Sequence, residues 1–272
     1  MVNHTFRHEE TEKGDKAMRS ALMVTYGVAC YAVFFITFLY AVGFVGDVGV
    51  PQSVDSAPAD ALPGALTADV VLLGLFALQH SGMARQGFKR WITHWLPRAL
   101  ERSTYVLMSS LVLILLFWQW RALPQVVWQV SAPWAAWLLY ALFAGGWLMV
   151  LTGTFAINHF DLFGLRQVWL RARGREYAPL AFTMRSYYRL VRHPLMLGFI
   201  IAFWAAPRMT LGHLLFAAAG TGYILIALQL EEQDLVAYHG DAYRDYQRRV
   251  PMLCPWPRPR ARPAPQACAK TE

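Results

Sequence analysis

The chain has 272 residues, of which 56% are apolar and 15% are charged, whereas an average globular domain has about half and about a quarter. The apolar residues lie in long uncharged blocks, which excludes a disordered protein. They also exclude a nucleic-acid-binding protein, despite the net charge of +8. The three cysteines, Cys30, Cys254 and Cys268, have neither metal nor redox spacing, so we expect no disulfide framework.

Six uncharged blocks follow one another along the chain. They cover residues 21–46, 70–84 (or 61–84 if Asp69 is included), 103–120, 133–157, 194–207 and 209–230. A helix needs about 20 apolar residues to cross about 30 Å of hydrocarbon, and the blocks lack the alternating polarity of barrel strands. The fifth block is short, so it either begins earlier, near Tyr187, or forms half of a tight hairpin with the sixth. We therefore predict an all-α integral membrane protein, a bundle of five to six transmembrane helices with a C-terminal helical hairpin.

The basic residues are distributed unevenly between the segments that connect these blocks. Alternate segments, beginning with the N-terminal one and ending with the C-terminal tail, carry 23 of the 25 Lys and Arg residues. The positive-inside rule then places both termini in the cytoplasm of a bacterial inner membrane, with six crossings or with four crossings and a hairpin. We expect one domain over 1–272, with an N-terminal segment (1–20), four spans (21–157), a C-terminal half (158–254) and a disordered Pro/Arg-rich tail (255–272).

Polar clusters within or beside the spans are candidate sites, because burying polar groups in lipid is costly. In the first, residues 79–85, His80 lines a cavity or else belongs to an interfacial cap from which Arg85 reaches the headgroups. In the second, Glu101 to Tyr105, the favoured interpretation is a helix cap with a surface ion pair.

The third cluster follows the fourth span and combines polar and aromatic residues. Its polar members are Asn158, His159, Asp161, Arg166 and Gln167. A histidine two residues from an aspartate could be a base with an orienting carboxylate. The alternative is an amphipathic connector that lies on the membrane surface.

The fourth cluster has two parts, one at the start of the fifth block and one at the end of the sixth. Arg192 and His193 precede the fifth block, and Glu231 and Glu232 follow the sixth. If the two blocks form a hairpin, these four side chains converge at one depth. A pocket with a cation, an imidazole and two carboxylates could hold a zwitterionic ligand. Taken singly, Pro194 is an ordinary helix start and Arg192 an ordinary membrane anchor.

The fourth cluster resembles the signature of the isoprenylcysteine carboxyl methyltransferase and phospholipid methyltransferase superfamily. The matching residues are Arg192-His193-Pro194, Gly198, Glu231-Glu232, Gly240-x-x-Tyr243-x-x-Tyr246 and Val250-Pro251, while Met196 stands where many relatives have tyrosine. The resemblance implies a cytoplasmic pocket for S-adenosylmethionine, with Tyr188 near the adenosine and Glu231 or Glu232 at the polar end. The complete implied cofactor-binding set is Tyr188, Arg192, His193, Pro194, Leu195, Met196, Gly198, Glu231 and Glu232.

The first three clusters resemble the bacterial methanethiol S-methyltransferase family, which converts methanethiol to dimethyl sulfide. The matching segments are residues 79–85, 101–105 and 158–167, of which the first is shared with NnrU-like membrane proteins. The thiol of such a reaction needs a base, and we expect His159 in this role with Asp161 as its orienter, or the reverse, since an imidazole titrates near physiological pH. Arg166 would hold either Asp161 or the cofactor carboxylate, and the substrate pocket would include His80, Asn158 and Phe160.

Two other classes of function stay open at this stage. One is a methyltransferase that acts on another thiol, an isoprenylcysteine carboxylate or a lipid amine. The other is a non-enzymatic NnrU-like protein of nitrogen-oxide metabolism. The expected partners are a small volatile thiol and the lipid bilayer. We expect no nucleic acid, no protein partner and no metal, because the histidines lack ligand spacing with carboxylates or cysteines.

Overall fold

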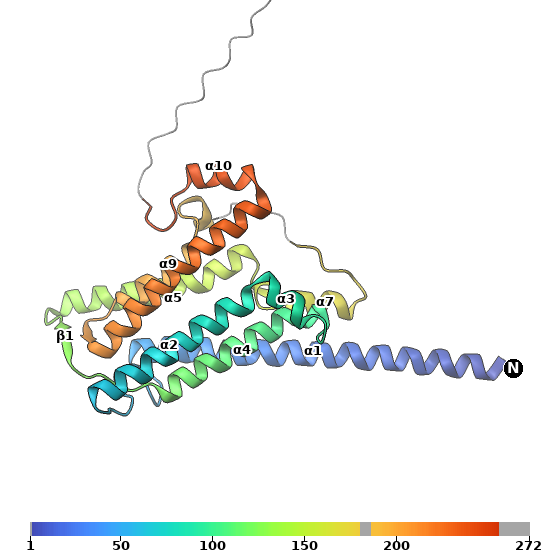
Figure 1. Ribbon diagram of the computed structural model, residues 1–272, viewed down its shortest axis with the longest axis horizontal. Helices are drawn as coiled ribbons and strands as arrows, with labels where there is room; N and C mark the ends of the chain where they lie inside the picture. Colours follow the sequence, from blue (N-terminus) through green and yellow to red (C-terminus); the bar gives the residue numbers. More distant parts are fainter. Residues whose placement is uncertain (1, 180–185, 256–272) are drawn as a thin grey trace, which may run out of the picture.

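The computed structural model describes residues 2–179 and 186–255, and these are mainly helical (Figure 1). The long helices are α1 (Val2–Gly46), α2 (Leu62–Ala84), α4 (Arg98–Gln119), α5 (Pro133–Ile157) and α9 (Leu211–His239). The shorter ones are α3 (Gln86–Ile92), α6 (His159–Leu162), α7 (Leu165–Ala172), η1 (Ser186–Arg189), α8 (Pro194–Trp204) and α10 (Asp241–Arg249). Two short strands, β1 (Val126–Gln129) and β2 (Arg208–Thr210), pair antiparallel.

Five helices are long and apolar enough to cross a membrane. They are the Gly14–Gly46 part of α1, together with α2, α4, α5 and α9, and α8 is a shorter apolar helix. The predicted all-α membrane fold with five to six spans is therefore confirmed. The limits of α5 are those predicted, and α2 includes Asp69, whose carboxylate accepts a hydrogen bond from the Arg121 backbone N–H at 2.9 Å.

Two helices are longer than the uncharged blocks indicated. α1 begins at Val2 instead of residue 21, and its first turns project alone from the bundle in Figure 1. α9 continues past the predicted end at Leu230 to His239. Charged residues such as Glu and Lys are good helix formers, so the loss of hydrophobicity does not end either helix. α9 ends at His239, and the next residue, Gly240, has a φ of +58° and a ψ of −132°, which suit glycine alone.

The predicted C-terminal hairpin is formed by α8 and α9. Only Ala205 to Thr210 connect them, and β2 in this connection pairs with β1. α8 packs so closely on α5 that a Cβ on Gly146 or Gly198 would lie 2.7 Å from the carbonyl oxygen of the other glycine. Close helix approach through small residues is a usual means of association in membranes.

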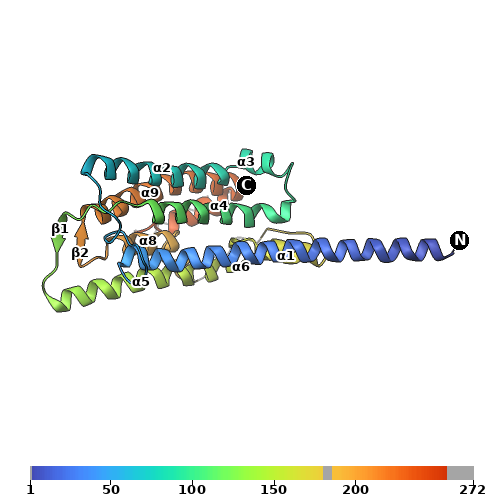
Figure 2. The same cartoon turned by 90° about the horizontal axis from the view of Figure 1, so that it is seen from below.

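The two ends of the bundle differ in composition. We call the end with residues 47–61, β1 and β2 the strand end, and the end with α3, α6, α7 and α10 the basic end (Figures 1 and 2). At the strand end, Val54 and Trp120 have no exposed surface, and the Trp120 Nε1–H donates to the Val54 carbonyl at 3.2 Å. The strand end is therefore closed, and the four predicted clusters lie toward the basic end. The C-terminal tail predicted as disordered lies, from residue 256 on, outside the described residues.

Candidate active site

The hairpin brings Arg192, His193 and Glu232 together, as the sequence predicted. Arg192 binds the Glu232 carboxylate with two nitrogens, Nε at 2.6 Å from Oε1 and Nη2 at 2.8 Å from Oε2. The His193 Nε2 lies 2.8 Å from the same Oε1. All three residues are buried, with at most 8% of each exposed. A two-pronged contact of this kind is strong and fixes the geometry of both partners.

The rest of the superfamily signature closes around this ion pair. The Arg192 Nη1 donates to the Val250 carbonyl at 2.6 Å, and the Arg192 backbone N–H donates to the Pro251 carbonyl at 2.9 Å. The Tyr243 hydroxyl donates to Glu232 at 3.1 Å, and the Tyr246 hydroxyl donates to the carbonyl of Tyr188, at 2.6 Å. Most signature residues therefore hold α10 and the end of α9 against the start of α8.

The two adjacent glutamates have different surroundings. The Glu232 side chain is 11% exposed and accepts hydrogen bonds from Arg192, Tyr243 and Gln247, besides its contact with His193. The Glu231 side chain is 50% exposed, and its Oε2 lies 3.8 Å from the His193 Nδ1. Because it is more exposed and accepts fewer hydrogen bonds, Glu231 is the glutamate whose oxygens remain available to a ligand. Its negative charge also acts on Tyr188, since burial and the neighbouring charge of Glu231 raise the pKa of the Tyr188 phenol.

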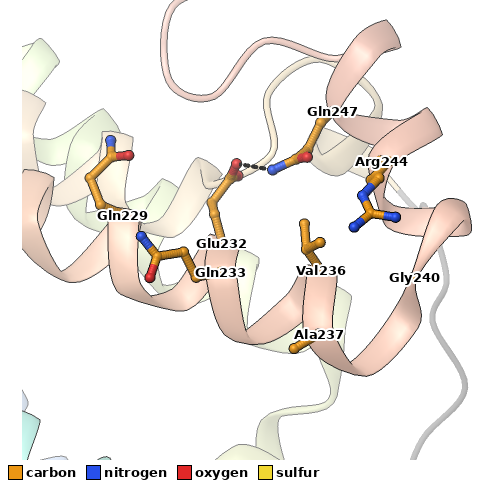
Figure 3. Close-up of a pocket in the computed structure, with 8 residues that line it drawn as sticks. All are labelled: Gln229, Glu232, Gln233, Val236, Ala237, Gly240, Arg244 and Gln247. Carbon is orange, nitrogen blue, oxygen red and sulfur yellow. Dashed lines mark hydrogen bonds between the residues drawn. The ribbon is translucent and has the colours of Figure 1, made fainter.

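A groove of about 670 Å³ runs between α9 and α10. Figure 3 shows Glu232 on α9 and Gln247 on α10 pointing toward each other beside it, joined by a hydrogen bond of 2.6 Å. The remaining lining residues are Gln229, Gln233, Val236, Ala237, Gly240 and Arg244. Its volume is in the usual range of ligand pockets. Of the predicted cofactor-binding residues, Glu232 alone lines this groove in the described part of the chain.

Four of the predicted cofactor-binding residues lie on α8, where packing explains several of them. Pro194 is fully buried at the start of the helix, and Met196 packs against the hydrophobic core. Leu195 lies against Gly153 of α5, where its Cβ would be 3.6 Å from a Cβ added to that glycine. Gly198 faces α5, where helix packing requires a glycine, and its contact with the cofactor stays a prediction.

His159 is 4% exposed and has both ring nitrogens in hydrogen bonds. Its Nδ1 lies 2.8 Å from the Thr154 Oγ1, and its Nε2 lies 2.8 Å from the Tyr31 hydroxyl. Because Thr154 donates its own proton to the Leu151 carbonyl, it must accept from Nδ1–H. The Nε2 is then an acceptor, and Tyr31 donates to it. Burial lowers the pKa of His159 from its ordinary value of 6.5, which favours this neutral form.

Asp161 does not orient His159, contrary to the prediction. Its Oδ1 accepts from the Arg166 Nη1 at 2.8 Å, and its Oδ2 accepts from the Tyr177 hydroxyl at 3.3 Å. The reason is the short helix α6, in which the Asn158 side chain caps the Asp161 N–H and directs Asp161 away from His159 toward α7. Arg166 was predicted to hold either Asp161 or the cofactor carboxylate, and the structure contains its contact with Asp161.

Two of the predicted substrate-pocket residues, Asn158 and Phe160, line a second hollow. Its volume is about 460 Å³, and its other lining residues are Val24, Val28, Leu165, Arg166, Val168 and Trp169. The hollow lies between α1 and the α6–α7 segment, and most of its walls are apolar. His159 lies beside it, stacked on Phe155 with 4.2 Å between ring centroids.

The third predicted pocket residue, His80, lies in a polar cluster between α2, α4 and α9. The Tyr105 hydroxyl is 2.8 Å from the His80 Nε2, and the Ser109 hydroxyl is 3.1 Å from the His80 Nδ1. Beside them, the Ser81 and Tyr223 hydroxyls are 3.0 Å apart. Sequence reasoning did not single out Tyr31 or Tyr223, although a phenol within an apolar span is itself a signal, because burying it in lipid without a partner is costly.

Comparison of the sequence with known proteins identifies the family of this chain. A family model described as NnrU protein matches residues 70–230. The chain is 58% identical over 240 residues to a methanethiol S-methyltransferase of Mycobacterium tuberculosis, covering 88% of this chain and 98% of the relative. It is 53% identical to a methanethiol S-methyltransferase of Crocosphaera subtropica, covering 86% of this chain and 92% of the relative.

A more distant relative is nurim of Rattus norvegicus, 34% identical over 61% of this chain and 66% of its own length. No solved structure matches the chain. Each of the two bacterial relatives covers more than four fifths of this chain. The chain therefore belongs to the methanethiol S-methyltransferase family and is a methyltransferase of the membrane.

Proposed function

We propose that this protein transfers the methyl group of S-adenosylmethionine to methanethiol, giving dimethyl sulfide and S-adenosylhomocysteine. The observation that carries the proposal is the 58% identity, over 88% of the chain, to a relative named for this activity. The geometry supports it, because the residues that distinguish the family converge at the basic end. The basic residues of that end favour placing it, with both termini, on the cytoplasmic side of the inner membrane.

The residues around Glu231 fit the donor. The methionine end of S-adenosylmethionine carries an ammonium group, which needs a carboxylate with available oxygens. Glu231 is half exposed, whereas Glu232 is occupied by Arg192 and His193. We therefore assign the ammonium to Glu231, with Tyr188, His193, Leu195 and Met196 around the donor. When bound, the donor supplies an electrophilic methyl group on a positively charged sulfur.

The methyl acceptor must lose a proton, because a thiol with a pKa near 8.5 is only a few per cent ionised at neutral pH. His159 suits this step, since its Nε2 is a neutral acceptor and its Nδ1–H is fixed by Thr154. In this mechanism the thiol proton passes to Nε2, directly or through the Tyr31 hydroxyl. The thiolate sulfur then forms a bond to the methyl carbon as the carbon–sulfur bond of the donor breaks.

The position of His159 relative to α8 supports its role as the base. Thr154, which holds the imidazole, is the neighbour in sequence of Gly153, and Gly153 packs directly on Leu195. The start of α8 and the base are thus joined through the last turn of α5. The apolar hollow beside Asn158 and Phe160 suits a substrate that dissolves in lipid and arrives sideways. Apolar walls also exclude water from the reacting sulfur.

The proposal is tested by headspace gas chromatography of the purified protein with S-adenosylmethionine and methanethiol. We expect dimethyl sulfide to form in proportion to protein and time. Failure to form it, with protein that is folded and binds S-adenosylhomocysteine, would overturn the choice of acceptor but not of donor. A panel with an isoprenylcysteine and a lipid amine as acceptors, and labelled donor, would then identify the alternative substrate.

A further inference from the structure

Arg102, near the start of α4, is not in the position that the sequence favoured. The favoured interpretation was a surface ion pair with Glu101 at a helix cap, but the residue at the cap is Pro97, which makes no side-chain capping bond. The Arg102 Nε instead donates to the Leu162 carbonyl of α6, at 2.8 Å. The guanidinium carbon lies 5.4 Å from the centre of the Tyr105 ring. Arg102 therefore faces the interior between α4 and α6.

Packing between α4, α2 and α9 connects Arg102 to the part of α9 that carries Glu231. The hydroxyl of Tyr105, the ring beside Arg102, is 2.8 Å from the His80 Nε2, and the His80 ring centre lies 6.4 Å from that of Tyr223 on α9. Glu231 follows Tyr223 on the same helix by about two turns. Within residues 2–179 and 186–255, no carboxylate lies within ion-pair distance of Arg102, and its terminal Nη atoms make no hydrogen bond. Arg192 and Arg166, by contrast, each bind a carboxylate of their own. Arg102, unlike these two arginines, thus has its two terminal nitrogens available for a ligand.

We propose that Arg102 binds the α-carboxylate of the methyl donor, while Glu231 binds its α-ammonium. This inference rests on the proposed function and extends it to a residue outside the superfamily signature. The methionine end of the donor is a zwitterion, so it needs one cation and one anion that are not already paired with each other. The planar fork of a guanidinium matches the two oxygens of a carboxylate, and Arg102 keeps its two outer nitrogens for this purpose.

The Nε of Arg102 also connects this residue to the segment that carries His159. Its acceptor, Leu162, is the last residue of α6, and His159 is the first. Gly164, which follows α6, has a φ of +89°, and a Cβ there would lie 2.5 Å from the Ser103 hydroxyl oxygen. The turn after α6 is therefore pressed directly onto the start of α4. Arg102 thus holds the segment that carries the base next to the polar end of the donor.

The test compares two ligands that differ in the amino-acid end. S-adenosylhomocysteine has the α-carboxylate, and 5′-methylthioadenosine lacks the whole amino-acid group. Both are titrated calorimetrically into wild type, Arg102→Gln, Arg102→Lys and a matched control, Arg98→Gln, which changes an exposed arginine one turn earlier on α4. Thermal unfolding of each variant reports whether it is folded.

We expect Arg102→Gln to weaken S-adenosylhomocysteine about tenfold to a hundredfold, as for loss of a charge-assisted hydrogen bond, and to leave 5′-methylthioadenosine unchanged. Arg98→Gln should change neither affinity. If Arg102→Gln lost affinity equally for both ligands, or lost affinity for neither, the inference would be overturned and the proposed donor would stand. Absence of S-adenosylhomocysteine binding to folded wild type would overturn both. If Arg102→Gln does not fold, Arg102→Lys decides by the same ligand comparison, since a lysine cannot bind a carboxylate with a fork.

Discussion

The strand end and the basic end both contain buried polar residues, but they use them differently. At the strand end, Asp69 accepts from a backbone N–H, Thr210 donates to Asp55, and the segment 47–61 closes the bundle. At the basic end, Arg192 and Glu232 neutralise each other, while Glu231 is half exposed and Arg102 uses only its Nε in a hydrogen bond within the part of the chain that the structure describes. A polar residue at the end of a span therefore marks a site only when its hydrogen-bonding capacity is not already occupied by the protein.

The largest effect that the comparison predicts is on turnover. His159→Ala should lower the rate of dimethyl sulfide formation about 10²-fold to 10⁴-fold, the usual contribution of a general base. The affinity for S-adenosylhomocysteine should stay unchanged. Headspace kinetics measure the rate, and His94→Ala, at an exposed position after α3, is the control. Turnover that survives His159→Ala would remove His159 as the base.

Substituting Glu232 should lower the stability of the fold, whereas substituting Glu231 should not. Glu232→Gln removes the charge partner of the buried Arg192 and should destabilise the fold by about 3–5 kcal/mol. Glu231→Gln makes the same chemical change one residue earlier, at a half-exposed side chain, and should leave the midpoint of unfolding nearly unchanged. Thermal unfolding in detergent measures both. Equal destabilisation by the two variants would contradict the division of roles.

A change at the strand end should affect stability alone. Asp69→Ala leaves the Arg121 N–H without its acceptor and should cost about 1–3 kcal/mol of stability. Asp60→Ala removes an exposed partner of the Arg121 side chain, where about 1 kcal/mol or less is expected. Thermal unfolding compares the two variants. A loss of S-adenosylhomocysteine affinity in Asp69→Ala would show that the two ends are coupled.

The smallest expected effect concerns Asp161 and the pH dependence of turnover. Since burial lowers the pKa of His159, the imidazole stays neutral until the pH falls below 6.5. The rate should decline only below that pH, as Nε2 becomes protonated. Asp161→Asn should leave this acidic limb in place, because Asp161 binds Arg166 and not the imidazole. An acidic limb that moves in Asp161→Asn would restore Asp161 as the orienter.

Much of the fold could be predicted from the sequence, because an uncharged block of about 20 residues has few alternatives to a membrane span. The pairing of Arg192 with Glu232 followed from the hairpin. The partners of His159 did not follow, since Tyr31 is 128 residues away on α1 and no local pattern connects them. The sequence also placed Asp161 near His159, whereas the direction of its side chain depends on the cap that Asn158 forms.

The most direct test of the account is a calorimetric titration of S-adenosylhomocysteine into the folded wild-type protein and into Glu231→Gln. The account predicts binding to the wild type, and about tenfold weaker binding to the variant at an unchanged unfolding temperature. Binding that is equally tight in both proteins, or absent from folded wild type, would contradict it.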